Sequence, residues 1–157
     1  MINKITVITK RLSANDLGET GSHQAGILVP KAVVRLNFFP YLDPEEYNPS
    51  VEILTFCEEL NQTNALRYVY YNGKTRNEYR ITRMTKLLRD LDAAEGDLLI
   101  FSHQRAGEML LTIKRCNSNS EENIQDKSAN YPINNTTKEV TELKNGWTME
   151  EITEGKS

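Results

Sequence analysis

The amino-acid sequence predicts a mainly β (α+β) domain, an open barrel or sandwich whose ends are capped by two short helices. Short stretches rich in β-branched and aromatic residues recur along the first 116 residues, and Gly, Pro, Asn and Asp separate them. Two further stretches have the apolar spacing of a helix with one buried face. A chain of 157 residues is long enough to form one domain with its own core.

The individual elements follow from these local signals. Pro30 suits the first turn of a helix that extends to about residue 39. Thr85 is the expected N-cap of a second helix over residues 86–94, and Gly96 is its expected stop. The seven predicted strands lie at residues 2–12, 26–29, 51–57, 65–71, 74–82, 97–103 and 108–115.

The stretch YYNGKTRNEYRITR, residues 70–83, carries four basic residues and one acidic residue in a protein whose net charge is −3. The dipeptide Asn72-Gly73 predicts a hairpin with a type I′ turn, because both central residues of that turn need positive φ. Side chains of a strand alternate between its two faces. One face would bear Lys74, Arg76, Glu78 and Arg80, and the other Thr75, Asn77, Tyr79 and Ile81.

The alternating charges of this hairpin suit the edges of base pairs. Arginine and lysine can donate to guanine O6 and N7 and to phosphates, and a carboxylate such as Glu78 can accept from cytosine N4. Such a face would suit the major groove of a G·C-rich site. The same spacing is also compatible with a solvent-exposed strand face that carries cross-strand ion pairs.

The loop at residues 13–26 is a second candidate for function, because it is long for a connection inside a compact domain. Glycines at 21 and 26 frame Ser22, His23 and Gln24, and glycine lets a backbone approach a ligand closely. Histidine and glutamine side chains can donate to bases or phosphates. The alternative is an exposed surface loop without a ligand.

The acidity of the protein is concentrated in its C-terminal part. Residues 1–116 hold 15 basic and 14 acidic side chains, and residues 117–157 hold 4 basic and 8 acidic ones. Residues 1–116 are the predicted folded domain. The segment 117–157 is too polar to build a core and is predicted to be a linker or extension. Trp147 could dock on another surface or begin a further domain.

Several other classes of protein have weak support. No run is apolar and long enough to span a membrane, and the N-terminus lacks the apolar region of a signal peptide, so we expect a cytoplasmic protein. The two cysteines and two histidines lack the spacing of metal ligands. Two alternatives stay open: a small metal-dependent nuclease that uses tail carboxylates such as Glu142, and a protein-interaction barrel that binds an acidic partner.

Three blocks of the sequence resemble the N-terminal effector domain of the EcoRII-type (type II) restriction endonucleases. They are SANDLGETGSHQAGILVPK (13–31), NPSVEIL (48–54) and YYNGKTRNEYRITR (70–83), in the same order as in that family. The resemblance implies an open seven-stranded DNA-binding pseudobarrel, also seen in plant B-three transcription factors, that grips the major groove with two arms. The loop around His23 would be the N-terminal arm, and Lys74 to Arg80 would be the C-terminal arm.

The resemblance also implies sequence-specific binding to a short duplex such as CC(A/T)GG, without cleavage by this domain. By the same resemblance, binding would need no cofactor, and cleavage would belong to a separate catalytic domain that follows the 117–157 linker and uses Mg²⁺. We expect this chain to be a monomer. We expect base contacts from Arg76, Glu78, Arg80, Asn77, His23, Gln24 and Asp16. We expect backbone contacts from Lys10, Arg11, Ser22, Lys74, Thr75, Tyr79 and Arg83.

Overall fold

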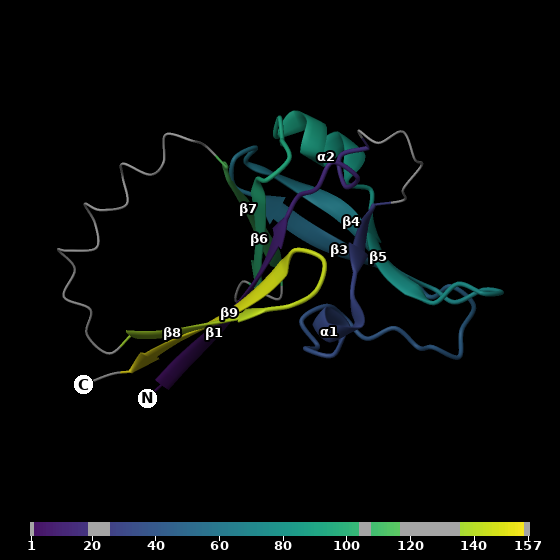
Figure 1. Ribbon diagram of the computed structural model, residues 1–157, viewed down its shortest axis with the longest axis horizontal. Coiled ribbons are helices and arrows are strands. Elements are labelled where there is room, and N and C mark those ends of the chain that lie inside the picture. Colours follow the sequence, from purple (N-terminus) through teal and green to yellow (C-terminus); the bar gives the residue numbers. More distant parts are fainter. Residues whose placement is uncertain (1, 19–25, 104–107, 117–135, 156–157) are drawn as a thin grey trace.

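The computed structural model describes residues 2–18, 26–103, 108–116 and 136–155, which form a curled open sheet with two short helices (Figure 1). The sheet has nine strands in the order β2-β5-β4-β3-β7-β6-β1-β9-β8. All neighbouring strands pair antiparallel except β3 and β7, which are parallel. The elements are β1 (Ile2–Arg11), β2 (Ile27–Val29), α1 (Lys31–Val34), β3 (Ser50–Cys57), β4 (Gln62–Tyr71), β5 (Glu78–Thr82), α2 (Thr85–Asp90), β6 (Leu98–His103), β7 (Met109–Lys114), β8 (Thr136–Glu142) and β9 (Trp147–Gly155).

The predicted fold class is confirmed, and each of the seven predicted strands has a counterpart in the sheet. Both helices are shorter than predicted. Met84, not Thr85, is the N-cap of α2, and no side chain caps that end of the helix. Beyond α2, Asp92 has a φ of 55°, so the chain leaves the helical conformation before it reaches Gly96. No helix in the described part of the chain is long and apolar enough to cross a membrane.

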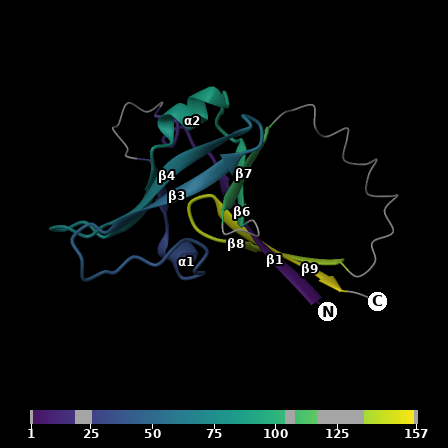
Figure 2. The ribbon, with the colours of Figure 1, turned by 180° about the vertical axis from the view of Figure 1, so that it is seen from behind.

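The end of the predicted polar extension is part of the sheet. β9 pairs with β1 from Ile2 opposite Gly155 to Lys10 opposite Trp147, and β8 forms the edge of the sheet beyond it. Both views of the ribbon place these strands on the side opposite to the connection between β4 and β5 (Figure 2). The sheet therefore continues past the boundary predicted at residue 116; residues 117–135 lie outside the described residues.

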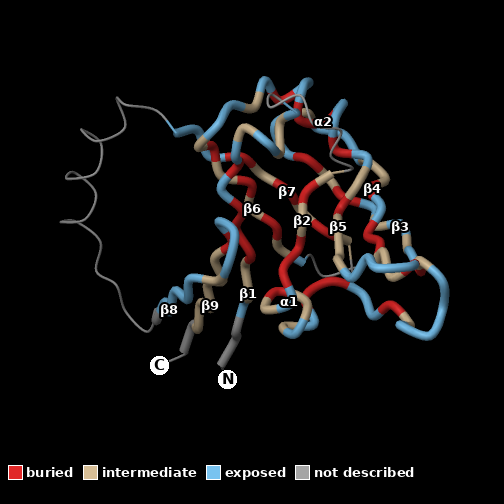
Figure 3. Tube along the Cα trace, turned by 45° about the vertical axis from the view of Figure 1, so that its right-hand side comes forward, coloured by how far each residue is buried: buried red, intermediate tan, exposed pale blue. Residues whose placement is uncertain are grey.

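The core brings together segments that are far apart in the sequence, as the buried residues in Figure 3 show. Phe39 lies in the irregular crossing, residues 35–49 between α1 and β3, and its ring packs against aromatic rings from three strands. Its ring stacks on Tyr68 with centroids 5.1 Å apart. It also meets Phe101 and Trp147 edge-on, at 6.0 Å and 6.3 Å. These contacts join the crossing, β4, β6 and β9 in a single apolar cluster.

Candidate nucleic-acid interface

The β4–β5 hairpin has a longer connection than the sequence predicts. The two strands pair from Arg67 opposite Thr82 to Tyr71 opposite Glu78, so residues 72–77 form a loop that extends away from the sheet (Figure 1). The predicted type I′ turn at Asn72-Gly73 is wrong, because neither residue has positive φ. The turn lies further on, where Lys74 has a φ of 56° and the Arg76 N–H donates to the Gly73 carbonyl at 2.9 Å.

This change of register divides the predicted basic face. Glu78 and Arg80 project from one face of β5, opposite Tyr71 and Val69 of β4. Lys74 and Arg76, the other two predicted members of this face, lie in the exposed 72–77 loop, and so does Thr75. Strand alternation therefore holds for residues 78–82, and the preceding loop sets the positions of the remaining cations.

Tyrosines hold the opposite face of the hairpin. Tyr79 stacks on Tyr70 with centroids 4.2 Å apart and on Tyr68 with centroids 5.8 Å apart. The Tyr70 hydroxyl donates to Asn77 Oδ1 at 2.8 Å. Ile81 lies on this face, as predicted, and is buried. Tyr79 and Asn77, both predicted to contact DNA, therefore help to fix the shape of the hairpin.

Glu78 is the electrostatic centre of the other face. Its Oε2 accepts from Arg76 Nη2 at 2.7 Å and from Arg80 Nε at 2.8 Å. The Arg76 guanidinium also lies 4.1 Å from the centroid of the Tyr71 ring, which is a cation–π contact. The hydrogen bond from Arg80, followed by that from Arg76, lowers the pKa of Glu78. Within the described part of the chain, no donor bonds Oε1 of this carboxylate.

We expect the ion pairs of Glu78 to weaken only in acid. The pKa of Glu78 is lowered in the folded protein, so their stabilising contribution is complete above the unfolded value of about 4.3 and is lost as the pH falls through the lower folded pKa. Thermal unfolding of the wild type and of Glu78→Gln should therefore differ by a constant amount near neutral pH and converge in stronger acid. A difference that stays constant down to about pH 2 would contradict this expectation.

Arg80 links the hairpin to the end of the 13–26 loop. β2 pairs with β5 with Leu28 opposite Arg80, and Arg80 Nη1 donates to the Gly26 carbonyl at 3.3 Å. Gly26 has a φ of +90°, and a Cβ on it would lie 1.9 Å from the Ile81 carbonyl oxygen, so glycine is required there. The structure thus brings the end of one predicted arm against the strand that carries the other.

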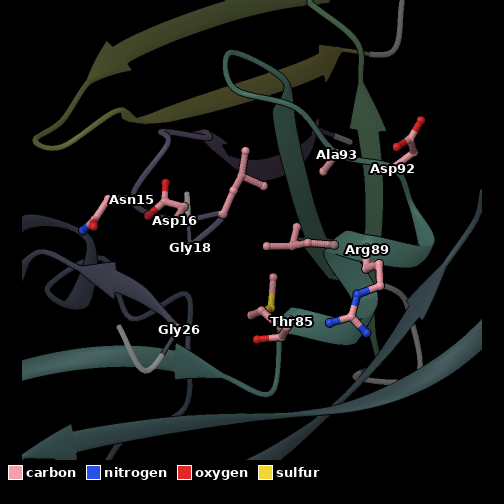
Figure 4. A pocket seen from close by; sticks show the side chains of 11 residues that line it. Asn15, Asp16, Gly18, Gly26, Thr85, Arg89, Asp92 and Ala93 are labelled. Carbon is pink, nitrogen blue, oxygen red and sulfur yellow. The ribbon is translucent and has the colours of Figure 1, made fainter. Parts of the chain in front are cut away.

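The start of the same loop lies beside α2, where a pocket of about 350 Å³ separates the two (Figure 4). Gly18 and Gly26 line one side of the pocket, and Thr85 and Arg89 of α2 line the other. Both described ends of the loop therefore lie next to this helix. The predicted contacts Ser22, His23 and Gln24 lie outside the described residues.

Two predicted DNA contacts are buried in the fold. The side chains of Lys10 and Asp16 are 6% and 10% exposed, and Lys10 Nζ lies 3.2 Å from Asp16 Oδ2. Lys10 Nζ also donates to the Asn145 carbonyl at 2.6 Å. Little of either side chain is therefore accessible for the predicted phosphate contact of Lys10 and the predicted base contact of Asp16, which stay predictions.

Two other predicted phosphate contacts are on the surface. Arg83 Nη1 donates to Glu52 Oε2 at 2.9 Å, and Arg11 Nη1 donates to the Gly96 carbonyl at 3.4 Å. Both arginines are exposed, so both can exchange these partners for a phosphate.

Asn72 has a role that the sequence did not reveal. Its side-chain carbonyl accepts from the Asn48 N–H at 2.8 Å, and its own N–H donates to Asn48 Oδ1 at 2.9 Å. Its Nδ2 donates to the carbonyls of Pro44 and Glu46 at 3.1 Å and 2.7 Å. These bonds fix the base of the 72–77 loop on the irregular crossing. The only sequence signal at this position was the Asn-Gly dipeptide, which indicated a turn.

The described residues contain no group of three or more His, Cys, Asp or Glu side chains that could hold a metal ion. The nuclease alternative required such a group near Glu142. That residue is exposed on β8, opposite Thr148 of β9.

Solved structures share this fold. The Arabidopsis FUS3–DNA complex superposes with a TM-score of 0.56 at 14% identity, over 69% of this chain and 96% of that chain. The B3 domain of UbaLAI restriction endonuclease, solved with its cognate DNA, superposes with a TM-score of 0.55 at 22% identity, over 96% of this chain and 89% of that one. The pseudobarrel fold implied by the three sequence blocks is therefore confirmed.

Sequence comparisons give the family. The type II restriction enzyme EcoRII of Escherichia coli is 44% identical over 82 residues, which are 49% of this chain and 20% of that enzyme. The chain thus matches about a fifth of the length of this curated relative. The family described as "Restriction endonuclease EcoRII, N-terminal" matches residues 2–139. Because that match extends over most of the sequence, the chain belongs to the family of the N-terminal domain of restriction endonuclease EcoRII.

Proposed function

We propose that this chain is the target-recognition domain of a type II restriction endonuclease and binds a short duplex such as CC(A/T)GG in the major groove. The observation that carries the proposal is the Glu78 carboxylate held between Arg76 and Arg80 at the end of the β4–β5 hairpin. In the major groove a G·C pair presents acceptors on guanine and a donor on cytosine, so donors and an acceptor at neighbouring positions can read both bases, and this cluster offers both.

The cluster keeps hydrogen-bonding capacity for a ligand. A guanidinium has five N–H donors, and the bonds to Glu78 and Gly26 use only some of them. Arg80 is 12% exposed and Arg76 is 50% exposed, so one arginine is held firmly and the other is open to solvent. Because the side chains are already ordered, binding would cost less conformational entropy than ordering free arginines.

The direct test is a gel-shift panel of short duplexes at one stated salt concentration, with CC(A/T)GG against each single-base variant. We expect the cognate duplex to bind most tightly and each substitution to cost about 1–3 kcal/mol. Equal affinity for every duplex would overturn sequence-specific recognition. Sedimentation of the same complexes would test the proposed binding by a monomer.

Cleavage belongs, in this proposal, to a separate catalytic domain that uses Mg²⁺. The basis is twofold. The chain matches only 20% of the length of EcoRII, and the interface proposed here is the cluster of Arg76, Glu78 and Arg80, whose groups suit base edges. Incubation of this chain with Mg²⁺ and the cognate duplex should leave the DNA intact, and cleavage by this chain alone would contradict the division of roles.

Lys74→Ala should weaken binding to all duplexes by a similar factor and lower the slope of log K against log salt by about 1, because Lys74 is exposed in the loop and suits a phosphate. The matched control is Lys86→Ala, which removes an exposed lysine from α2 that pairs with Asp90 at 2.6 Å. A change in base preference with an unaltered salt slope would show instead that Lys74 reads a base.

A further inference from the structure

The turn between β8 and β9 contacts the start of the 13–26 loop. Lys10, near the end of β1, donates from Nζ to the Asn145 carbonyl at 2.6 Å and lies 3.2 Å from Asp16 Oδ2. The Arg11 N–H donates to the Gly146 carbonyl at 2.9 Å. The buried ammonium of Lys10 therefore joins a loop carboxylate to the backbone of a turn that follows it by more than a hundred residues.

The same turn contacts the other end of the loop. Trp147, the first residue of β9, donates from Nε1 to the Leu28 carbonyl at 3.0 Å. Leu28 lies in β2, two residues after Gly26, and is opposite Arg80 of the β4–β5 hairpin. The Trp147 ring is 1% exposed and stacks on Phe101, so it has a fixed position from which to hold β2.

The backbone of the turn is shaped for this close approach. Gly146 has a φ of +83°, and a Cβ on it would lie 3.1 Å from the Arg11 carbonyl oxygen and 3.3 Å from Lys10 Nζ. Asn145 has a φ of 57°, in the left-handed region. A residue with a larger side chain at position 146 would push the turn away from β1.

Asp16, the partner of Lys10, also forms hydrogen bonds within the first turn of the loop. Its Oδ2 accepts from the Ser13 N–H at 2.9 Å, and its own N–H donates to Ser13 Oγ at 3.1 Å. A buried charge is tolerated only when it is paired and hydrogen-bonded, so Lys10 and Asp16 constrain each other far more than an exposed pair would.

From these contacts we infer that the β8–β9 hairpin positions the two described ends of the 13–26 loop, residues 13–18 and 26–29, for DNA binding, with Lys10 and Trp147 as positioning residues that do not touch DNA. The inference rests on the proposed function. It assigns a role in DNA recognition to the β8–β9 hairpin, which contributes no residue to the cluster of Arg76, Glu78 and Arg80. Fixing both ends of the loop before binding lowers the entropy that binding must remove, which increases affinity.

The test compares Lys10→Met with Lys138→Met in the full chain. Both variants remove one positive charge, but Lys138 is exposed on β8, where it pairs with Glu150 at 3.4 Å. We expect Lys10→Met to weaken binding of the cognate duplex about tenfold with the salt slope of the wild type, and Lys138→Met to bind like the wild type. A salt slope lowered by about 1 in Lys10→Met would mean a phosphate contact and would overturn the inference.

Trp147→Phe is the second variant, because it keeps an aromatic ring in the core and removes the donor to the Leu28 carbonyl. We expect weaker binding, faster amide exchange at residues 13–18 and 26–29, and unchanged exchange in β3, which is separated from β9 in the sheet by β7, β6 and β1. Wild-type binding and unchanged exchange in folded Trp147→Phe would overturn the inference and leave the proposed function standing. If the wild-type protein binds all duplexes equally, the proposed function is overturned. In that case faster exchange at the loop ends of Trp147→Phe would show only a structural role for Trp147, with no role in DNA recognition.

Discussion

Glu78→Ala is expected to relax the choice between the cognate duplex and its single-base variants by about 1–3 kcal/mol at the base pair that Glu78 contacts. The substitution removes the acceptor whose Oε1 can take a cytosine amino group. It also releases Arg76 and Arg80, which both bond Oε2 of the same carboxylate. The released arginines can still bind phosphates or other bases, so we expect total affinity to fall less than discrimination. The measurement is the ratio of dissociation constants across the duplex panel at one salt concentration.

Glu52→Ala is the matched control for this experiment. Glu52 lies on β3 and also bonds an arginine, Arg83, at 2.9 Å, so its removal changes the net charge and frees an arginine in the same way. It is not in contact with the Glu78 cluster, and we expect discrimination to stay at the wild-type level. Full discrimination in Glu78→Ala, or an equal loss in Glu52→Ala, would mean that Glu78 does not read a base.

The hairpin shows how far local sequence signals reach. Aromatic and β-branched residues located β4 and the end of β5, although β5 begins at Glu78 and not at residue 74, and alternation put Tyr79 and Glu78 on opposite faces. The turn was misplaced because Asn72 is held by Asn48 and by carbonyls of the crossing, 24 to 28 residues earlier in the chain. Those long-range hydrogen bonds outweigh the preference of an Asn-Gly pair for a tight turn, and a local pattern carries no information about them.

The buried pair of Lys10 and Asp16 illustrates the same limit for function. Two charged residues beside a long loop indicated contacts to DNA, but the carbonyl that completes the Lys10 site belongs to Asn145, 135 residues away. For the C-terminal strands a signal was present. Trp147 and Met149 alternate with polar residues in β9, which is the period of a half-buried strand, and the polar composition of residues 117–157 as a whole obscured it.

Trp147→Ala is expected to lower the free energy of unfolding by about 3–5 kcal/mol, which is a large part of the roughly 5–15 kcal/mol that stabilises a typical domain. The substitution removes a ring that is 1% exposed and leaves a cavity beside Phe39 and Phe101. It also leaves the Leu28 carbonyl without its indole donor. Urea unfolding followed by circular dichroism measures the change.

Tyr41→Ala is the control for that measurement, because Tyr41 is an aromatic residue that is 81% exposed, and its removal should change the free energy of unfolding by less than about 0.5 kcal/mol. The comparison separates two views of the C-terminal segment. If residues 136–155 were an appendage beside a complete domain, Trp147→Ala would be as mild as Tyr41→Ala. A large loss for Trp147→Ala alone means that β9, paired with β1, is part of the folded domain. The residue that contributes this stability also bonds the Leu28 carbonyl of β2, next to the β4–β5 hairpin.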